Sequence, residues 1–196
     1  IERIEIDESG GVGLVETSGR RSDWTVDFTG TTGSPATPSL TTDGDLHICA
    51  GTWYVQISVS ADVNLIGEDE STTILDGDGT GQVVSIATFS DVEISDLTIQ
   101  NGYTTSNGGG IYADTTTTLS LERVTVADNS AEGSGGGIYG AGSSNLTIEG
   151  SQISNNFATN GNGGGLVCTG CNAIIISNST FDANRASSAG GGMHLQ

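Results

Sequence analysis

A repeat of about 27 residues is the feature of this sequence that most constrains its fold. Runs of three glycines begin at four positions, spaced 27, 28 and 27 residues apart: Gly108, Gly135, Gly163 and Gly190. An asparagine recurs in step, at spacings of 28, 27 and 28: Asn101, Asn129, Asn156 and Asn184. Because two separate markers share one period, we infer that the chain is built from stacked, equivalent units.

Each unit contains short segments in which apolar and polar residues alternate. The glycines lead into one apolar residue, a polar turn follows, and two alternating segments are then separated by a one-residue break. In one unit the apolar positions are Ile111, Leu119, Leu121, Val124 and Val126. Alternation with period two is typical of strands with one buried face, and each segment is too short for a helix. The sequence therefore predicts an all-β parallel β-helix, a solenoid with three short strands per coil.

The repeat does not extend over the whole chain. We expect the β-helix to occupy residues 46–196 and residues 1–45, which contain both prolines, to form an N-terminal cap. Solenoids need caps because an open end exposes an unpaired strand edge. A strand is expected at Ile1 to Ile6. Since the sequence stops just inside a new coil, we expect either a fragment of a longer solenoid or an end that another surface covers.

The repeated asparagines and glycines have an architectural interpretation. Stacking would place Asn101, Asn129, Asn156 and Asn184 above one another, so that their side-chain amides form a hydrogen-bonded ladder. Asparagine and glycine also adopt the left-handed backbone of a sharp corner more readily than other residues. We therefore interpret both markers as structural.

The charge of the chain excludes several classes of partner. There are 24 acidic residues and five basic ones, lysine is absent, and the net charge is -19. Nucleic acids and anionic membranes would need a basic surface. No apolar run approaches the ~18 residues that span a bilayer. Because the chain begins at Ile1 without a visible leader, we expect a processed or trimmed protein that is secreted or displayed at the cell surface.

The three cysteines allow more than one interpretation. Cys168 and Cys171 form a C-x-x-C motif, and we expect a disulfide that closes the Thr-Gly turn in an oxidising compartment. A redox motif of the thioredoxin type would be followed by a helix, which the sequence does not indicate. A zinc site that adds His47 and Cys49 is a further alternative. With the disulfide, Cys49 would remain as a buried thiol.

The two markers also form short motifs. Gly-Gly is followed by an apolar residue at Ile111, Ile138, Leu166 and Met193, and Phe181-Asp182-Ala183-Asn184 reads Phe-x-x-Asn. Over residues 97–196 these motifs resemble the repeats of the polymorphic outer-membrane proteins. Residues 50–53 and 65–77 are similar to the opening coils of the pectate-lyase-like superfamily. The resemblance implies a right-handed, single-stranded parallel β-helix and, in the first family, a surface-exposed passenger that is often adhesive.

One segment has the composition of a calcium loop. Two aspartates and a threonine alternate with glycines from residue 76 to residue 81, and oxygen ligands of this kind suit hard cations. Asp76 and Asp78 are therefore candidate calcium ligands, and no other cofactor is expected. Ordinary turn chemistry explains the same residues.

A second candidate site is a column of outward-facing side chains. If the apolar residue after each glycine run points inward, its successor points outward, which selects Tyr112, Tyr139, Val167 and His194. Tyr112, Tyr139 and His194 could bind a sugar ring or a partner surface. Cross-strand aromatic pairing that stabilises the sheet is the alternative.

Catalytic groups are scarce in this sequence. A lyase that resembles the pectate lyases would need a cationic base and calcium-bridging carboxylates. The sequence indicates no acidic cluster in register with Arg123 or Arg185. A hydrolase would need paired carboxylates, and only Glu93, Glu122 and Glu149 recur near one corner. We therefore favour a non-catalytic, adhesin-like surface module that binds a glycan or a partner surface. Two alternatives are a structural subunit that self-assembles through open coil ends, and a polysaccharide lyase or hydrolase.

Overall fold

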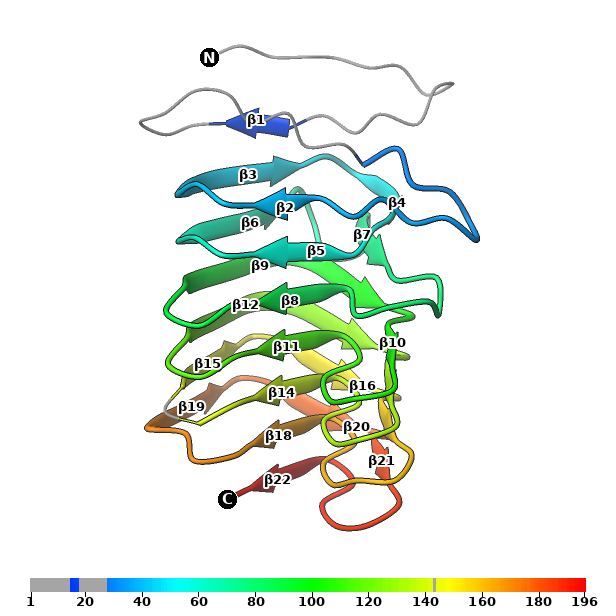
Figure 1. Cartoon of the computed structure of the whole chain (residues 1–196), viewed down its shortest axis with the longest axis vertical. Coiled ribbons are helices and arrows are strands. Elements are labelled where there is room, and N and C mark those ends of the chain that lie inside the picture. Colours follow the sequence, from blue (N-terminus) through cyan, green and yellow to red (C-terminus); the bar gives the residue numbers. More distant parts are fainter. Residues whose placement is uncertain (1–14, 18–27, 143) are drawn as a thin grey trace.

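The computed structural model describes residues 15–17, 28–142 and 144–196, and their regular elements are all β-strands. Figure 1 shows the strands stacked coil upon coil, with the described part forming one solenoid. The predicted strand at Ile1 to Ile6 lies outside the described residues. In the part of the chain that is described, no helix is long and apolar enough to cross a membrane.

One face of the solenoid is a seven-stranded parallel sheet. Its strands, in order, are β2 (Ser39–Leu40), β5 (Ile57–Val59), β8 (Val84–Ile86), β11 (Ile111–Ala113), β14 (Ile138–Gly140), β18 (Leu166–Cys168) and β22 (Met193–Leu195). Ile111 pairs with Val84 on one side and Ile138 on the other, so the strands after the glycine runs stack as the repeat predicts. The stacking begins at β2, on the N-terminal side of the predicted boundary at residue 46.

The second face is an eleven-stranded sheet that carries two stretches of each coil. Its strands are β1 (Val15–Thr17), β3 (Gly44–Ile48), β4 (Gly51–Tyr54), β6 (Val63–Gly67), β7 (Thr73–Asp76), β9 (Asp91–Gln100), β12 (Thr118–Ala127), β15 (Asn145–Glu149), β16 (Gln152–Ser154), β19 (Ala173–Ser177) and β20 (Thr180–Asp182). β1 runs antiparallel along β3, the first coil's strand in this sheet.

The one-residue break predicted within each coil is a column of left-handed residues. Asp96, Arg123, Gly150 and Asn178 have φ values of 55°, 54°, 56° and 50°. These residues occupy equivalent positions in successive coils. The strands on either side of the break therefore stay in register with those of the next coil.

A third, four-stranded sheet was not expected from the sequence. It consists of β10 (Tyr103–Thr104), β13 (Ser130–Ala131), β17 (Phe157–Ala158) and β21 (Arg185–Ala186). The sequence predicts a polar turn at these positions, because two residues are too few to show alternation. Each strand places one side chain outward and one small side chain inward, and two of the inward residues, Ala131 and Ala158, are fully buried. The turn thus becomes a narrow third face.

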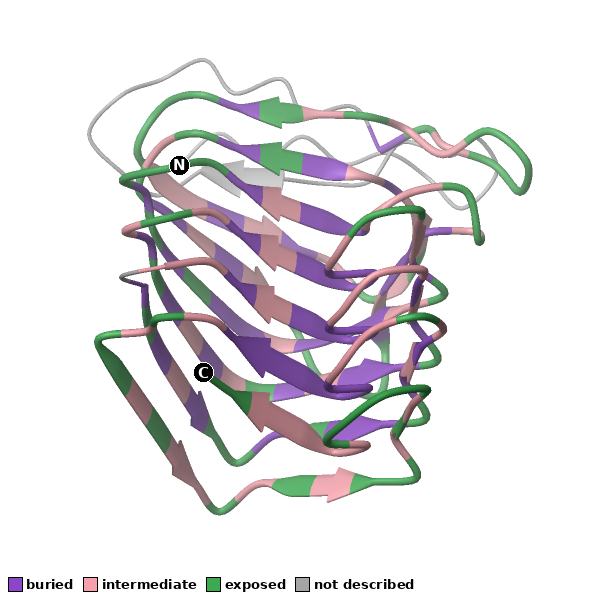
Figure 2. Ribbon diagram, turned by 60° about the horizontal axis from the view of Figure 1, so that its bottom comes forward, coloured by how far each residue is buried: buried purple, intermediate pink, exposed green. Residues whose placement is uncertain are grey.

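Inward-facing side chains of successive coils form continuous apolar columns. Leu65, Ile94, Leu121 and Ile148 stand in register, and each is 0% exposed. Figure 2 shows that buried residues follow the strands, whereas most exposed residues lie in the turns. This burial of aliphatic groups is the main stabilising contribution that a solenoid has.

Three asparagines form a largely buried ladder at one corner. Asn129 Nδ2 donates to Asn156 Oδ1, and Asn156 Nδ2 donates to Asn184 Oδ1, both at 3.0 Å. Each amide also donates to a backbone carbonyl of the preceding coil, at Ile99, Val126 and Ile153. Since buried polar groups are costly unless they are paired, the ladder specifies how the coils stack here.

Asn101 lies outside this ladder, contrary to the expectation from the sequence. Gln100 pairs with Ala127, so Asn101 aligns with Asp128 and Gly102 takes the ladder position. Gly102 N donates to Asn129 Oδ1 at 2.8 Å. The spacing of 28 residues between Asn101 and Asn129, one more than the 27 that separate Gln100 from Ala127, reflects this shift.

Candidate functional site

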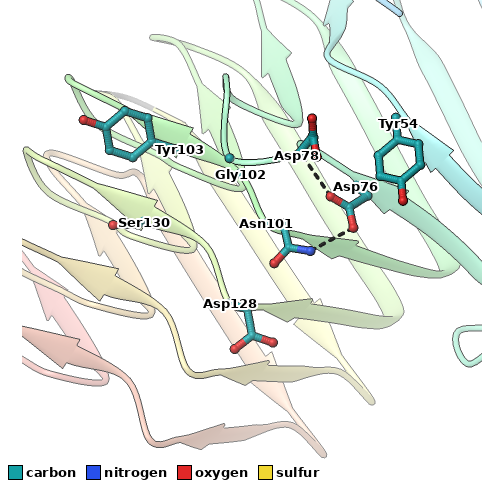
Figure 3. A pocket seen from close by; sticks show the side chains of 9 residues that line it. Tyr54, Asp76, Asp78, Asn101, Gly102, Tyr103, Asp128 and Ser130 are labelled. Carbon is teal, nitrogen blue, oxygen red and sulfur yellow. Dashed lines mark hydrogen bonds between the residues drawn. The ribbon is translucent and has the colours of Figure 1, made fainter. Parts of the chain in front are cut away.

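A cleft of about 530 Å³ opens on the corner that precedes the four-stranded sheet. Successive coils line it, with Tyr54, Asp76, Asp78, Gly79, Asn101, Gly102, Tyr103, Asp128 and Ser130. Figure 3 shows Tyr54 and Tyr103 at opposite ends, with Asp76, Asp78 and Asn101 between them. The residues are distant in sequence and meet because the coils stack.

Asp76 organises the centre of the cleft. Its side chain is only 5% exposed. Oδ1 accepts a hydrogen bond from Asp78 N at 2.8 Å, and Oδ2 accepts from Gln100 Nε2 and Asn101 Nδ2, both at 2.8 Å. Since all of these donors are neutral, they orient the Asp76 carboxylate and Asn101 without cancelling the negative charge.

The other two carboxylates are more accessible. Asp78 and Asp128 both have a left-handed backbone, with φ values of 54° and 57°. Asp78 Oδ2 accepts a hydrogen bond from Gly33 N. Asp128 is exposed, and within the described ranges no partner is found for its carboxylate. The cleft thus contains three carboxylates, one of which is open to a ligand.

The tyrosine at one end is held by a neighbouring acid. Tyr103 Oη donates to Glu132 Oε1 at 2.6 Å. This hydrogen bond is the main reason why the pKa of Tyr103 lies above its ordinary value, with burial and the charge of Glu132 adding to the effect. The neutral phenol therefore persists to alkaline pH, and its ring has a fixed place at the cleft's edge.

Both residues of the predicted calcium loop line this cleft. Their oxygens, however, already accept hydrogen bonds from protein groups, as ordinary turn and corner chemistry would provide. Over residues 28–142 and 144–196, no group of three or more His, Cys, Asp or Glu side chains is arranged to hold a metal ion. Calcium binding by Asp76 and Asp78 stays a prediction.

The predicted outward column lies on the seven-stranded sheet, away from the residues that line the cleft. Tyr112 and Tyr139 pair in register, and their rings stack with centroids 5.7 Å apart and an interplanar angle of 1°. Val167, which is 2% exposed, separates Tyr139 from His194. Because the tyrosines turn a face toward each other, the geometry favours the sheet-stabilising interpretation, and ligand binding by this column remains untested.

The cysteine pair lies where the C-x-x-C motif predicts. Cys168 and Cys171 are within disulfide-bonding distance, with Cα atoms 5.8 Å apart. Gly140 stacks on the pair, since a Cβ atom there would lie 3.0 Å from Cys168 Sγ. Cys49 is half-buried rather than buried as expected.

The register corrects the expected glutamate column and shows the partner of one arginine. Asp96 lies one coil before Arg123, and its carboxylate accepts hydrogen bonds from Nε at 2.5 Å and Nη2 at 2.8 Å. A single acid therefore stands in register with this arginine. Glu93 pairs with Ser120 instead of Glu122, so only Glu122 and Glu149 are aligned.

The in-register parallel sheets and the internal ladder define the class of β-solenoid proteins. Residues 68–196, well over half of the chain, match the family described as a right-handed beta helix region. The chain therefore belongs to the right-handed β-helix family. No curated protein and no solved structure matches it. This family defines the fold, whereas the cleft has to be interpreted from its own chemistry.

Proposed function

We propose that the chain is a non-catalytic β-helix module, secreted or at the cell surface, that binds a glycan in the cleft between Tyr54 and Tyr103. The observation that carries this proposal is the lining of the cleft. Aromatic rings stand at its two ends, and carboxylate, amide and hydroxyl groups lie between them.

This lining suits the surface of a sugar chain. Tyrosine rings pack against the apolar faces of sugar rings, while carboxylates and amides accept and donate hydrogen bonds to hydroxyl groups. Asp128 has an unpartnered carboxylate among the described residues, and Ser130 also lines the cleft. Because the tyrosines are at opposite ends, the cleft suits an oligosaccharide better than a monosaccharide.

Two features support binding without catalysis. The Asp76 carboxylate already accepts three hydrogen bonds, which leaves about one of its four lone-pair sites for exchanging a proton with a substrate. Arg123, bound to Asp96, and Arg185, packed over Phe157, do not line the cleft. A hydrolase is the second candidate, because three carboxylates do line the cleft.

The placement outside the cell rests on two further observations. The cysteine pair at bonding distance fits an oxidising compartment. The Gly-Gly-apolar and Phe-x-x-Asn repeats resemble those of the polymorphic outer-membrane proteins, whose passengers are exposed and often adhesive. We propose an adhesin-like role on this basis.

A glycan-binding screen with matched variants tests the proposal. The wild-type protein, Tyr54→Ala and Tyr112→Ala would be compared by titration calorimetry on the glycans that a panel identifies. We expect Tyr54→Ala to weaken binding at least about tenfold, as loss of one stacking ring does, and Tyr112→Ala to bind like wild type. Unfolding curves would verify that both variants fold.

Three outcomes would count against the proposal. Loss of binding in Tyr112→Ala alone would assign the ligand to the tyrosine column. Release of shortened or unsaturated sugar products would make the protein an enzyme. Absence of binding across neutral, acidic and amine-bearing glycans would reject the glycan-binding function.

A further inference from the structure

We infer that the cleft prefers a saccharide that carries a protonated amine over the same saccharide in neutral form, and disfavours acidic glycans. The inference rests on glycan binding at the cleft, as proposed above. It concerns the chemical class of the ligand, which neither the fold nor the repeat specifies.

The first argument is the charge of the lining. Asp76, Asp78 and Asp128 all line the cleft, and none of the described residues that line it is basic. The two arginines in the described ranges are occupied elsewhere. Arg123 is bound to Asp96 and Glu122, and Arg185 packs over the ring of Phe157. Among the described residues, no protein cation therefore compensates these carboxylates within the cleft.

The second argument is the nature of the existing hydrogen bonds. Asp76 is bound by two side-chain amides and one backbone N–H, and Asp78 is bound by the backbone N–H of Gly33. Neutral donors leave a carboxylate with its full charge. A ligand ammonium would add a charge-assisted contact, whereas a uronate or sulfate would meet like charges.

The negative charge of Asp128 can be removed by substitution without straining the backbone. It aligns with Asn101 and Asn155 in neighbouring coils, and the three φ values are 57°, 54° and 56°. Asparagine therefore already occupies this left-handed position on both sides. Asp128→Asn keeps the size and the conformation and removes only the charge.

The experiment compares oligosaccharides of equal length made of glucosamine, N-acetylglucosamine or a uronic acid. Titration calorimetry would be done at low salt and at a pH where the amine is protonated. The glucosamine oligosaccharide should bind at least about fivefold more tightly than the N-acetylglucosamine one, the effect of one close charge pair in water. Asp128→Asn should reduce this ratio of the two affinities. Glu149→Gln removes one charge from an exposed strand residue outside the cleft and should leave the ratio unchanged. Added salt should weaken the preference by screening.

The outcomes separate this inference from the proposed function. Equal affinity for the amine and its N-acetyl form, tighter binding of the uronic acid, or the same preference in Asp128→Asn as in wild type would each overturn the inference while glycan binding stands. If none of the three saccharides and no other glycan binds, the proposed function fails and the inference fails with it.

Discussion

Gly137 makes room for Asn156. A Cβ atom on Gly137 would lie 2.8 Å from Asn156 Cγ, closer than such atoms can approach. Gly110 and Gly165 stand in the same relation to Asn129 and Asn184, each at 2.9 Å. The two markers of the repeat therefore pack as one unit, in which the third glycine of the first three runs accommodates a ladder asparagine.

Gly137→Ala should destabilise the protein by about 1–3 kcal/mol, the usual cost of overpacking a well-packed site. The added methyl group must displace either the Asn156 amide or the backbone of the next coil, since Gly165 O is also within 2.7 Å of its position. Urea unfolding would measure this change. Gly142→Ala is the matched control, because its methyl group would have only Thr169 O nearby, at 3.7 Å. Equal stability of the two variants would contradict the packing argument.

Asn156→Ala should lower the free energy of unfolding by about 3 kcal/mol, because it leaves several buried partners without a hydrogen bond. Asn129 loses the acceptor for its N–H and its amide, and Val126 O loses a donor. Asn155→Ala is the control, since Asn155 is exposed and Ala183 already occupies the equivalent left-handed position at φ 52°. Equal free energies of unfolding for the two variants, measured in urea, would show that the ladder does not stabilise the protein.

Tyr103 should ionise at a higher pH than an ordinary tyrosine, because Glu132 accepts its hydroxyl hydrogen bond. The raised pKa means that the neutral phenol favours the folded state below about pH 10, and that this contribution is lost as pH rises through the folded pKa. Ultraviolet titration, with Tyr103→Phe subtracted, would follow the group. Glu132→Gln should lower the apparent pKa, and a titration that this substitution leaves unchanged would refute the assignment.

Arg123→Gly should be more stable than Arg123→Ala. Both substitutions remove the pair with Asp96, which is solvent-exposed and therefore weak. Only glycine relieves the left-handed backbone, as Gly150 does at the same place in the next coil. Thermal unfolding of the two variants is the measurement. A higher melting temperature for Arg123→Ala would show that the backbone conformation at this break carries no strain.

The sequence was informative about the coil and less so about its corners. Alternation located the long strands because a buried column of Leu65, Ile94, Leu121 and Ile148 requires an apolar residue at each level. The two-residue strands of the third sheet carry no such pattern. Asn101 was misplaced because a motif match cannot reveal a one-residue shift in register, which only the pairing of Gln100 with Ala127 fixes.

The cleft could not be read from motifs, because its lining comes from residues as far apart as Tyr54 and Ser130. The sequence pattern indicates only a calcium loop at Asp76 and Asp78, whereas the hydrogen bond by which Asp76 orients Asn101 depends on the stacking of the coils. One signal was available. Asn101 and Asp128 are one 27-residue period apart, and this spacing alone indicates that polar residues align at this corner.

Hydrogen exchange of the protein with and without a bound oligosaccharide tests the central claim most directly. Binding in the cleft should slow exchange in residues 76–79 and 101–104, where backbone amides border the ligand. Residues 111–113 and 138–140, which carry the stacked tyrosines, should exchange as before. Protection confined to that tyrosine column would contradict the account and place the ligand on the seven-stranded sheet.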